Sequence, residues 1–401
     1  MAYNPHGPRI SFCSKAVPMN VRLIACAITL FSVVALLAAE PTPTSAERIE
    51  SRQFPSVFQA WNPVDSLKDE DKWTLLARHD LVFHAPDFFG LNWASEFQGL
   101  STTFTKDSQE AAMRTRKLLL GKNPNLIMLA ELRYRDAHQS YLPEEHAWWK
   151  RKDGRRVVGW EEGSYFLLDF SNSAYRDQVA QQAKAVMDSG VFDGLMLDWW
   201  EDDEDRLALV KAIRKQIGDS ALILVNANDR QTPRTAAFVN GYFMECYKSK
   251  TVEDWKQIAE TLEWAESNLK QPRINCLETW FHESRQDLHL MRATTTLSLT
   301  LSDGYCLFSD PNPLPTPDHL HDWYRFWGRS LGRPKVKGER KLDGSIQRKF
   351  DRGLAVYNPP GNKPVTIDFT TPHTAASSRK TAMTFTVPAG DGDLFLKEDQ
   401  K

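Results

Sequence analysis

Two carboxylic acids stand where buried strands of this chain are expected to end. Asp198 lies at the end of the apolar run Gly194–Trp199 (GLMLDW), and Glu245 lies at the end of Gly241–Cys246 (GYFMEC). A carboxylate that follows an apolar run must pair, bind a ligand or react, because burying an unpaired charge is costly. The acidic residues 202–204 are better placed than Asp198 to cap the next helix. We therefore predict that Asp198 and Glu245 are catalytic.

Two carboxyl groups in one cleft suit hydrolysis of a glycosidic bond. One group attacks the anomeric carbon or activates water, while the other, protonated, releases the leaving oxygen. Two nearby carboxyl groups also raise the pKa of one of them, which keeps the acid protonated. We predict Asp198 as the nucleophile and Glu245 as the general acid/base of a retaining enzyme, with Glu278 as the main rival for the acid role.

Further polar and aromatic residues follow the same expected strands and could bind sugar hydroxyls or stack on sugar rings. Each has a structural alternative, such as a salt bridge or packing at the rim. No metal site and no cofactor is predicted, because the acidic run Glu201–Asp205 is typical of a solvated helix start. The predicted substrate-binding residues are Trp61, His84, Glu131, Arg133, Trp199, Asn226, Asn228, Glu278 and Trp280.

Eight short apolar runs alternate with amphipathic stretches, which is the pattern of repeated βα units. Most runs are continuous, as expected of parallel strands buried on both faces. Eight such strands over about 280 residues predict an α/β fold, the (β/α)8 TIM barrel, whose strand ends carry the site. The expected strands are Ser56–Trp61, Asp80–Ala85, Asn125–Glu131, Gly194–Trp199, Ala221–Asn226, Gly241–Cys246, Arg273–Thr279 and Gly304–Ser309.

The segment Arg133–Asp169 is too long for a plain connection and is expected to help build the site. It contains Trp148, Trp149 and Trp160, and a short strand is expected at Tyr165–Phe170. The amphipathic stretches elsewhere predict helices, several of which open with a capping Ser, Thr or Asn. The clearest are Ser66–His79, Ser108–Gly121, Ser173–Ser189, Glu204–Ile217, Val252–Leu269, Arg285–Leu299 and Pro317–Leu331.

Beyond Gly332 the pattern changes to short alternating runs separated by Pro and Gly turns. This predicts a small C-terminal antiparallel β-sandwich over residues 336–401, after a catalytic barrel over residues 47–335. The expected strands are Phe350–Tyr357, Val365–Phe369, Thr381–Val387 and Asp393–Leu396.

The N-terminal part is typical of an export signal. The uncharged apolar run Leu23–Ala39 follows Arg22 and precedes a Pro/Thr/Ser stretch. We predict a signal peptide and linker over residues 1–46, with Met19 as an alternative start of translation, and hence a periplasmic or extracellular protein. An uncleaved run would instead anchor the chain to a membrane.

Composition narrows the partners and the redox chemistry. The net charge of −2 and the lack of a Lys/Arg block argue against a nucleic-acid partner, so a carbohydrate is the expected partner. The 13 Trp residues suit either a large core or platforms for sugar rings. Cys246, Cys276 and Cys306 lie in apolar segments without metal-ligand spacing, and we expect buried thiols. The oligomeric state is left open.

Two short motifs carry a family resemblance. Leu168–Arg176 (LDFSNSAYR) resembles the "LD-x-SNP-x-YR" stretch of several barrel glycosidase relatives, with Ser173 where Pro is usual, and Asp193–Asp198 resembles the "DG-hydrophobic-x-LD" element that follows it. The chain thus resembles glycosyl hydrolase-like family 15 and, more distantly, the polygalactosaminidase-type, α-galactosidase and α-amylase superfamily barrels. The resemblance implies a nucleophile ending strand four, Asp198, and an acid/base ending strand six, Glu245.

Three hypotheses stay open at this point. The first is an exported retaining glycosidase acting on an oligo- or polysaccharide, and carboxyl groups about 5–7 Å apart in an open cleft would favour it. The second is a non-catalytic carbohydrate-binding barrel, which Glu245 locked against an Arg or Lys would favour. The third is a metal-using barrel hydrolase, which three or more oxygen ligands around Asp202 would favour.

Overall fold

The computed structural model describes residues 43–161, 163–311 and 319–397, and residues 43–401 form one compact unit. The predicted export signal lies outside the described residues. Helix α1 (Ser45–Ser51) is capped by Thr44 and begins two residues before the predicted barrel boundary at residue 47. The boundary at residues 335/336 stays a prediction. Among the described residues, no helix has both the length and the apolar character needed to cross a membrane.

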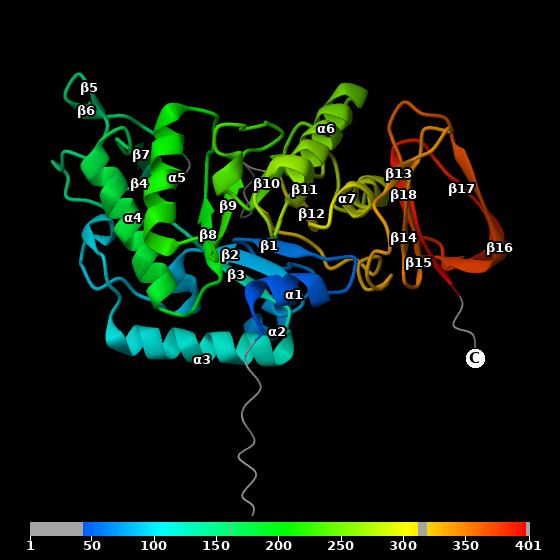
Figure 1. Cartoon of the computed structure of the whole chain (residues 1–401), viewed down its shortest axis with the longest axis horizontal. Helices are drawn as coiled ribbons and strands as arrows, with labels where there is room; N and C mark the ends of the chain where they lie inside the picture. The colour runs from blue at the N-terminus through cyan, green and yellow to red at the C-terminus, as the bar shows by residue number, and fades with distance from the viewer. Residues whose placement is uncertain (1–42, 162, 312–318, 398–401) are drawn as a thin grey trace, which may run out of the picture. The chain divides into compact units, whose positions relative to one another are not determined.

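Eight parallel strands form a barrel and follow one another in chain order (Figure 1). The first and last strands close it, because Val57 and Cys306 form a parallel bridge and the Cys306 N–H donates a hydrogen bond of 2.9 Å to the Ser56 carbonyl. All eight predicted strands are confirmed, as is the barrel. They are β1 (Phe58–Ala60), β2 (Leu81–His84), β3 (Ile127–Glu131), β8 (Gly194–Leu197), β9 (Leu222–Asn226), β10 (Gly241–Cys246), β11 (Cys276–Trp280) and β12 (Tyr305–Ser309).

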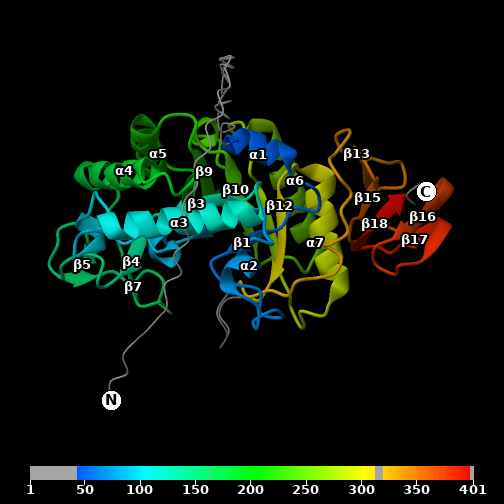
Figure 2. The same ribbon diagram turned by 90° about the horizontal axis from the view of Figure 1, so that it is seen from below.

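Helices cover the outside of this barrel, and α3 runs along one side of it in two perpendicular views (Figures 1 and 2). The predicted helix Ser66–His79 is reduced to the short α2, because residues 65–71 form turns. The helices after β1 are α2 (Lys72–Leu76), α3 (Lys106–Lys122), α4 (Ser173–Asp188), α5 (Glu204–Ile217), α6 (Val252–Asn268) and α7 (Leu288–Leu301), with short 3₁₀ turns η1 (Pro86–Phe89), η2 (Gln98–Leu100) and η3 (Ala236–Phe238).

The predicted helix Pro317–Leu331 is wrong over its described part, which contains only turns and extended backbone. The side chains at 319, 320, 321, 324, 326 and 327 are all buried. On a helix these positions would spread over more than half of the circumference, so one amphipathic face could not bury them together. Packing of the aromatic and histidine side chains outweighs the local helical preference here.

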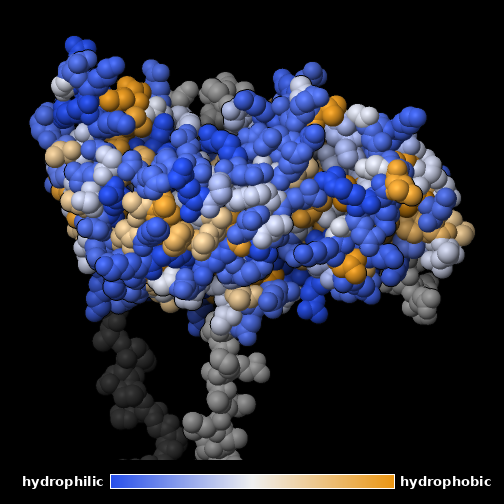
Figure 3. All heavy atoms as spheres, turned by 45° about the horizontal axis from the view of Figure 1, so that its top comes forward, coloured by the Kyte–Doolittle hydropathy of each residue, from blue (hydrophilic) through white to orange (hydrophobic). Residues whose placement is uncertain are grey.

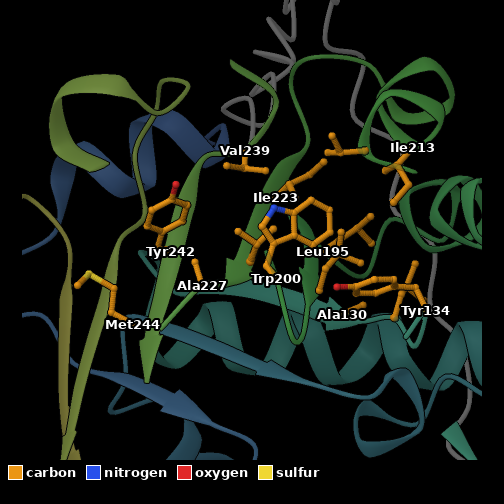
Figure 4. Close-up of a cluster of buried hydrophobic side chains, with 14 of the residues drawn as sticks. Ala130, Tyr134, Leu195, Trp200, Ile213, Ile223, Ala227, Val239, Tyr242 and Met244 are labelled. Carbon is orange, nitrogen blue, oxygen red and sulfur yellow. The ribbon is translucent and has the colours of Figure 1, made fainter. Parts of the chain in front are cut away.

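The chain directly after Asp198 is fixed by a large buried aromatic residue. Trp200 lies among buried side chains that come from β8, β9 and α5 (Figure 4). Its indole N–H donates a hydrogen bond of 3.0 Å to the Thr235 hydroxyl, and its backbone N–H donates one of 2.7 Å to the Asn226 carbonyl. These contacts hold the end of β8, and therefore Asp198, against the neighbouring strand.

A two-part excursion leaves the barrel after β3. Strand β4 (Asp136–His138) pairs with β7 (Tyr165–Leu167), which confirms the short predicted strand. The two-residue strands β5 (Arg151–Lys152) and β6 (Arg155–Arg156) form a separate hairpin. The excursion returns the chain to the pocket side of the barrel, where Tyr165 lies within reach of the site.

A six-stranded antiparallel sheet follows the barrel and lies beside α7 in both ribbon views (Figures 1 and 2). The register of β16 shifts between Asp368 and His373, and only its second part pairs with β18. The sheet bends there over a small apolar core, so the predicted C-terminal sandwich is one folded sheet. Its strands are β13 (Glu339–Arg340), β14 (Ile346–Phe350), β15 (Gly353–Asn358), β18 (Asp391–Lys397), β16 (Val365–Ala375) and β17 (Thr381–Val387), in spatial order.

Helix α7 is buried between the barrel and this sheet. Its Thr294, Thr295 and Thr296 hydroxyls donate hydrogen bonds of 2.7–2.8 Å to carbonyls one turn back, which satisfies polar groups that burial would otherwise penalise. Gly392 allows β18 to approach, because a Cβ there would collide with Thr296. Arg292 forms an ion pair of 2.6 Å with the buried Asp391.

The hydropathy of the surface and the burial of the thiols are typical of a globular protein. Figure 3 shows a face that is mostly hydrophilic, with hydrophobic groups scattered over it. Cys246, Cys276 and Cys306 are buried free thiols, as predicted. Burial raises the pKa of the Cys306 thiol to about 12, so this group is not a nucleophile at neutral pH.

Candidate active site

A pocket of about 300 Å³ lies at the carboxyl ends of the barrel strands. Active sites of TIM barrels lie at this end, because the strand ends and following loops converge there. Seven of the predicted site residues lie in this pocket together. Its lining residues are Trp61, Asn62, His84, Ala85, Glu131, Arg133, Trp160, Tyr165, Asp198, Trp199, Glu245 and His319.

One amide group joins the two predicted catalytic acids. The side-chain nitrogen of Asn226, at the end of β9, donates a hydrogen bond of 2.8 Å to Asp198 Oδ1 and another of 2.8 Å to Glu245 Oε2. The two carboxyl oxygens are therefore separated by at most twice that distance. Retaining glycosidases place their carboxyl groups about 5–5.5 Å apart, whereas inverting enzymes need about 6.5–9.5 Å to admit a water molecule.

Burial raises the pKa of both acids, but their charged neighbours differ. Burial raises the pKa of Glu245 to about 8; the charge of His319 opposes this rise, and the carboxylates of Glu278 and Asp198 add to it. Glu245 is therefore protonated at neutral pH. Burial also raises the pKa of Asp198, but Arg133 and the Asn226 hydrogen bond favour its charged form.

Arg133 lines the pocket and lies near both Glu131 and Asp198. It forms an ion pair of 3.0 Å with Glu131, whose other oxygen accepts a hydrogen bond of 2.9 Å from the Trp61 indole. Burial disfavours the guanidinium charge, but Glu131 and its other anionic neighbours outweigh this effect and raise the pKa of Arg133. Its guanidinium also lies 4.7 Å from the centre of the Tyr165 ring. A fixed positive charge thus faces the pocket beside Asp198.

Three pocket residues have a backbone conformation that L-amino acids rarely adopt. The φ angles of Trp61, Trp199 and His319 are 45°, 54° and 60°. Left-handed backbone at non-glycine residues costs free energy and is often found at functional sites. Trp199 is also exposed by 43%, directly after Asp198, and Arg135 lies over its ring at 4.3 Å. The rim of the pocket therefore presents a supported aromatic surface to solvent.

Four predicted site residues lie outside the pocket lining. Asn226 lies behind the two acids and bridges them, and Asn228 donates a hydrogen bond of 3.0 Å to the Glu245 carbonyl. Glu278 is fully buried and bonded to His319, so it cannot meet a substrate from this position. Trp280 packs against the Tyr247 and His319 rings instead of lining the pocket.

The structure adds four polar or aromatic lining residues, besides Ala85, that the sequence prediction missed. Trp160 and Tyr165 reach the pocket from the excursion after β3, whose site-building role was expected although these side chains were not selected. Asn62 follows the predicted Trp61 directly. His319 was hidden inside a wrongly predicted helix; its one sequence signal is its position soon after strand eight, beyond Pro311, Pro313, Pro315 and Pro317.

The acidic run near the start of α5 is engaged in ion pairs. Asp203 caps the helix and pairs with Arg206, and Glu204 pairs with Arg234. Asp202 also pairs with Arg234, at 3.4 Å. These contacts agree with a solvated helix start. Among residues 43–161, 163–311 and 319–397, no group of three or more His, Cys, Asp or Glu side chains could hold a metal ion.

The fold agrees with that of solved barrel structures. The chain is similar to Eubacterium rectale Amy13B, with a TM-score of 0.51, 10% identity, and coverage of 90% of this chain and 100% of that one. It is equally similar in fold to the α-amylase of Geobacillus thermoleovorans solved with acarbose (TM-score 0.51, 10% identity, 89% and 100% covered) and to an α-amylase from Lactobacillus plantarum (0.51, 10%, 87% and 98%).

These comparisons establish the class of fold, an amylase-like TIM barrel with a C-terminal β domain. No protein-family model matches the sequence, and no curated protein matches it. The relation to glycosyl hydrolase-like family 15 and to α-galactosidase-type barrels therefore stays a prediction from the two motifs at Leu168–Arg176 and Asp193–Asp198.

Proposed function

We propose that this protein is an exported retaining glycoside hydrolase in which Asp198 is the nucleophile and Glu245 is the general acid/base. The observation that carries the proposal is the shared hydrogen-bond donor, Asn226, which keeps one oxygen of each carboxyl group within twice 2.8 Å of the other. This short separation supports a double displacement. Burial also raises the pKa of Glu245 to about 8, which suits a general acid.

The two groups can perform both steps of the reaction. First, an Asp198 oxygen attacks the anomeric carbon, the bond to the leaving oxygen breaks, and the Glu245 proton passes to that oxygen. Then the Glu245 carboxylate takes a proton from water, the water oxygen attacks the anomeric carbon, and the bond to Asp198 breaks. Arg133 supports the Asp198 carboxylate before the attack, because it places a positive charge beside it.

The pocket supplies groups that suit a sugar ring. Trp61 and Trp199 offer aromatic surfaces, on which apolar sugar faces stack. His84 stays neutral because burial lowers its pKa to about 4, so it can exchange hydrogen bonds with hydroxyl groups without adding charge. The Glu131–Arg133 pair adds both an acceptor and a donor. A carbohydrate is therefore the substrate that this lining fits best.

The family relation and the export are part of the same proposal. The motifs at Leu168–Arg176 and Asp193–Asp198 support a place near glycosyl hydrolase-like family 15, and the apolar run Leu23–Ala39 supports export. Separating cells into cytoplasmic, membrane and exterior fractions tests the export. Protein found only in the cytoplasm would contradict it.

A hydrolysis screen tests the activity. Purified protein is offered 4-nitrophenyl α- and β-glycosides and a panel of polysaccharides, including starch because the fold neighbours are α-amylases. The variants Asp198→Asn and Glu245→Gln are compared with Asp205→Asn and Glu253→Gln, which change exposed acids at helix starts. We expect the first pair to lose at least about 10³-fold in rate and the second pair to keep full rate.

Two outcomes would contradict the proposal. Full activity in both Asp198→Asn and Glu245→Gln would remove the catalytic assignment. Binding of a polysaccharide without hydrolysis of any tested bond would favour the non-catalytic barrel. The described ion pairs give that second function no support, since none locks Glu245 against an Arg or Lys.

A further inference from the structure

A fully buried carboxyl group lies behind the pocket and takes no part in the proposed reaction. Glu278 lies in the middle of β11, beside Glu245 of β10 in the strand register, and its side chain has an exposed fraction of 0%. Its oxygens accept hydrogen bonds from the Ser309 hydroxyl and, at 2.9 and 3.0 Å, from His319 Nδ1. Burying a carboxylate is costly unless it is paired. The partner of Glu278 is His319, which also faces Glu245.

His319 is oriented by Glu278 on one side and faces Glu245 on the other. Because Glu278 accepts at Nδ1, that nitrogen carries a hydrogen and Nε2 is left to face Glu245 Oε1 at 3.9 Å. The Trp61 ring packs on the imidazole with 5.1 Å between ring centres. His321, two residues on, stays neutral because burial lowers its pKa to about 4. A carboxylate behind a histidine fixes its tautomer and stabilises its imidazolium form.

We propose that Glu278 and His319 are positioning residues that supply a counter-charge to Glu245 whenever Glu245 is a carboxylate. This inference rests on the proposed function, in which Glu245 must change from an acid in the first step to a base in the second. The base form would otherwise be a buried anion beside two other carboxyl groups. Glu278 stabilises a positive charge on His319, and that charge stabilises the Glu245 carboxylate during the second step.

The groups that face Glu245 come from four elements. Asp198 extends from β8, Asn226 from β9, Glu278 from β11 and His319 from the segment after β12. Burial and the charges of Glu278 and Asp198 raise the pKa of Glu245. The charge of His319 and the hydrogen bond from Asn226 lower it, and the resulting pKa is about 8. Among these groups His319 is the one positive charge, so its removal should act on Glu245 in one direction only.

The titration of Glu245 tests this directly and needs no substrate. The protein is labelled with ¹³C at the glutamate carboxyl carbon, and the Glu245 signal is assigned by its loss in Glu245→Gln. We expect His319→Gln to move the Glu245 midpoint upward by about one pH unit, because an opposite charge within about 4–6 Å is lost. The control His138→Gln, at an exposed site on β4, should leave the midpoint unchanged.

A second pair of variants isolates the role of Glu278. In the His319→Gln background, Glu278→Gln removes only a like charge, so the Glu245 midpoint should fall. In the wild-type background the same substitution also destabilises the imidazolium form of His319, so the Glu245 midpoint should fall less or rise. Equal shifts in the two backgrounds would show that Glu278 acts as a distant charge alone and would overturn the proposal.

An unchanged or lowered midpoint in His319→Gln would also overturn it. Circular dichroism checks that each variant is folded, and His319→Asn serves as the second variant if glutamine is not tolerated. If the Glu245 midpoint does not shift as expected, the result of the hydrolysis screen is unaffected. A protein without hydrolytic activity could still show the expected shifts of the Glu245 midpoint. The two proposals can thus fail separately.

Discussion

Asp198 and Glu245 accept hydrogen bonds from the same nitrogen atom, although they extend from strands that are not neighbours in the barrel. The donor is the side-chain amide of Asn226, on the strand between them. One small side chain therefore sets the distance between the two acids and supports the charged form of each.

The substitution Asn226→Ala should slow hydrolysis strongly without removing either acid. Each carboxyl group loses a hydrogen bond that favours its charged form, and a hydrogen bond to a charged group contributes about 1.5–3 kcal/mol, or roughly 10- to 100-fold in rate. Steady-state kinetics on any hydrolysed glycoside from the screen measures the effect. A rate within twofold of wild type would show that the bridge is unimportant. Asn268→Ala, at the exposed end of α6, is the matched control.

The value of kcat/KM should show a bell-shaped dependence on pH. Asp198 must be charged to attack, and its pKa lies above its usual value, so kcat/KM falls on the acid side. Glu245 must be protonated, and its pKa of about 8 predicts a fall above that pH. Measuring kcat/KM from pH 4 to 10 gives both limbs. Unchanged kcat/KM up to pH 10 would contradict the role of Glu245 as the acid.

Glu245→Gln should stabilise the protein on the alkaline side. The folded state holds the Glu245 proton up to about pH 8, whereas the unfolded chain releases it near its ordinary pKa, so Glu245 makes the protein less stable as pH rises through that window. Glutamine carries no such penalty. Thermal unfolding at pH 9 should show a Tm higher than wild type by about 2 °C or more, with a smaller gain at pH 5. Equal Tm values at pH 9 would contradict the high pKa.

Trp199→Ala should weaken substrate binding more than it slows the chemical steps. The ring is exposed and supported by Arg135, so its removal costs little packing but takes away a stacking surface beside Asp198. We expect KM to rise about tenfold, which corresponds to about 1.4 kcal/mol, while kcat changes little. Met383→Ala, which removes another exposed hydrophobic side chain, on β17, serves as the control. An unchanged KM would mean that substrate does not reach this rim.

The sequence was most informative where burial alone decides the structure. The eight strands could be predicted because most of them are continuous apolar runs, and the positions of Asp198 and Glu245 follow from where two of those runs end. The meeting of the two acids could be expected, but the amide that joins them could not, since Asn226 was one of several polar residues at strand ends.

The missed residues depend on contacts that local patterns do not encode. His319 reaches the site through a left-handed backbone position and the packing of buried aromatic residues that prevent a helix there. Tyr165 lies on β7, which pairs with β4, and the Trp160 backbone N–H donates a hydrogen bond of 3.2 Å to Asp136 on β4. Glu278 lies beside Glu245 in the register of β10 and β11, yet Ser309 and His319 bind it behind the pocket. Its place in the strand alone cannot reveal this difference.

Covalent trapping tests the central claim most directly. The protein is incubated with activated 2-deoxy-2-fluoro glycosides of both anomeric configurations, which form the glycosyl-enzyme but hydrolyse slowly, and its mass is measured before and after digestion. The proposed mechanism predicts a mass increase of one fluorosugar, located on the peptide that contains Asp198 and absent in Asp198→Asn. A label on another residue, or hydrolysis of the matching glycosides with no label at all, would contradict it.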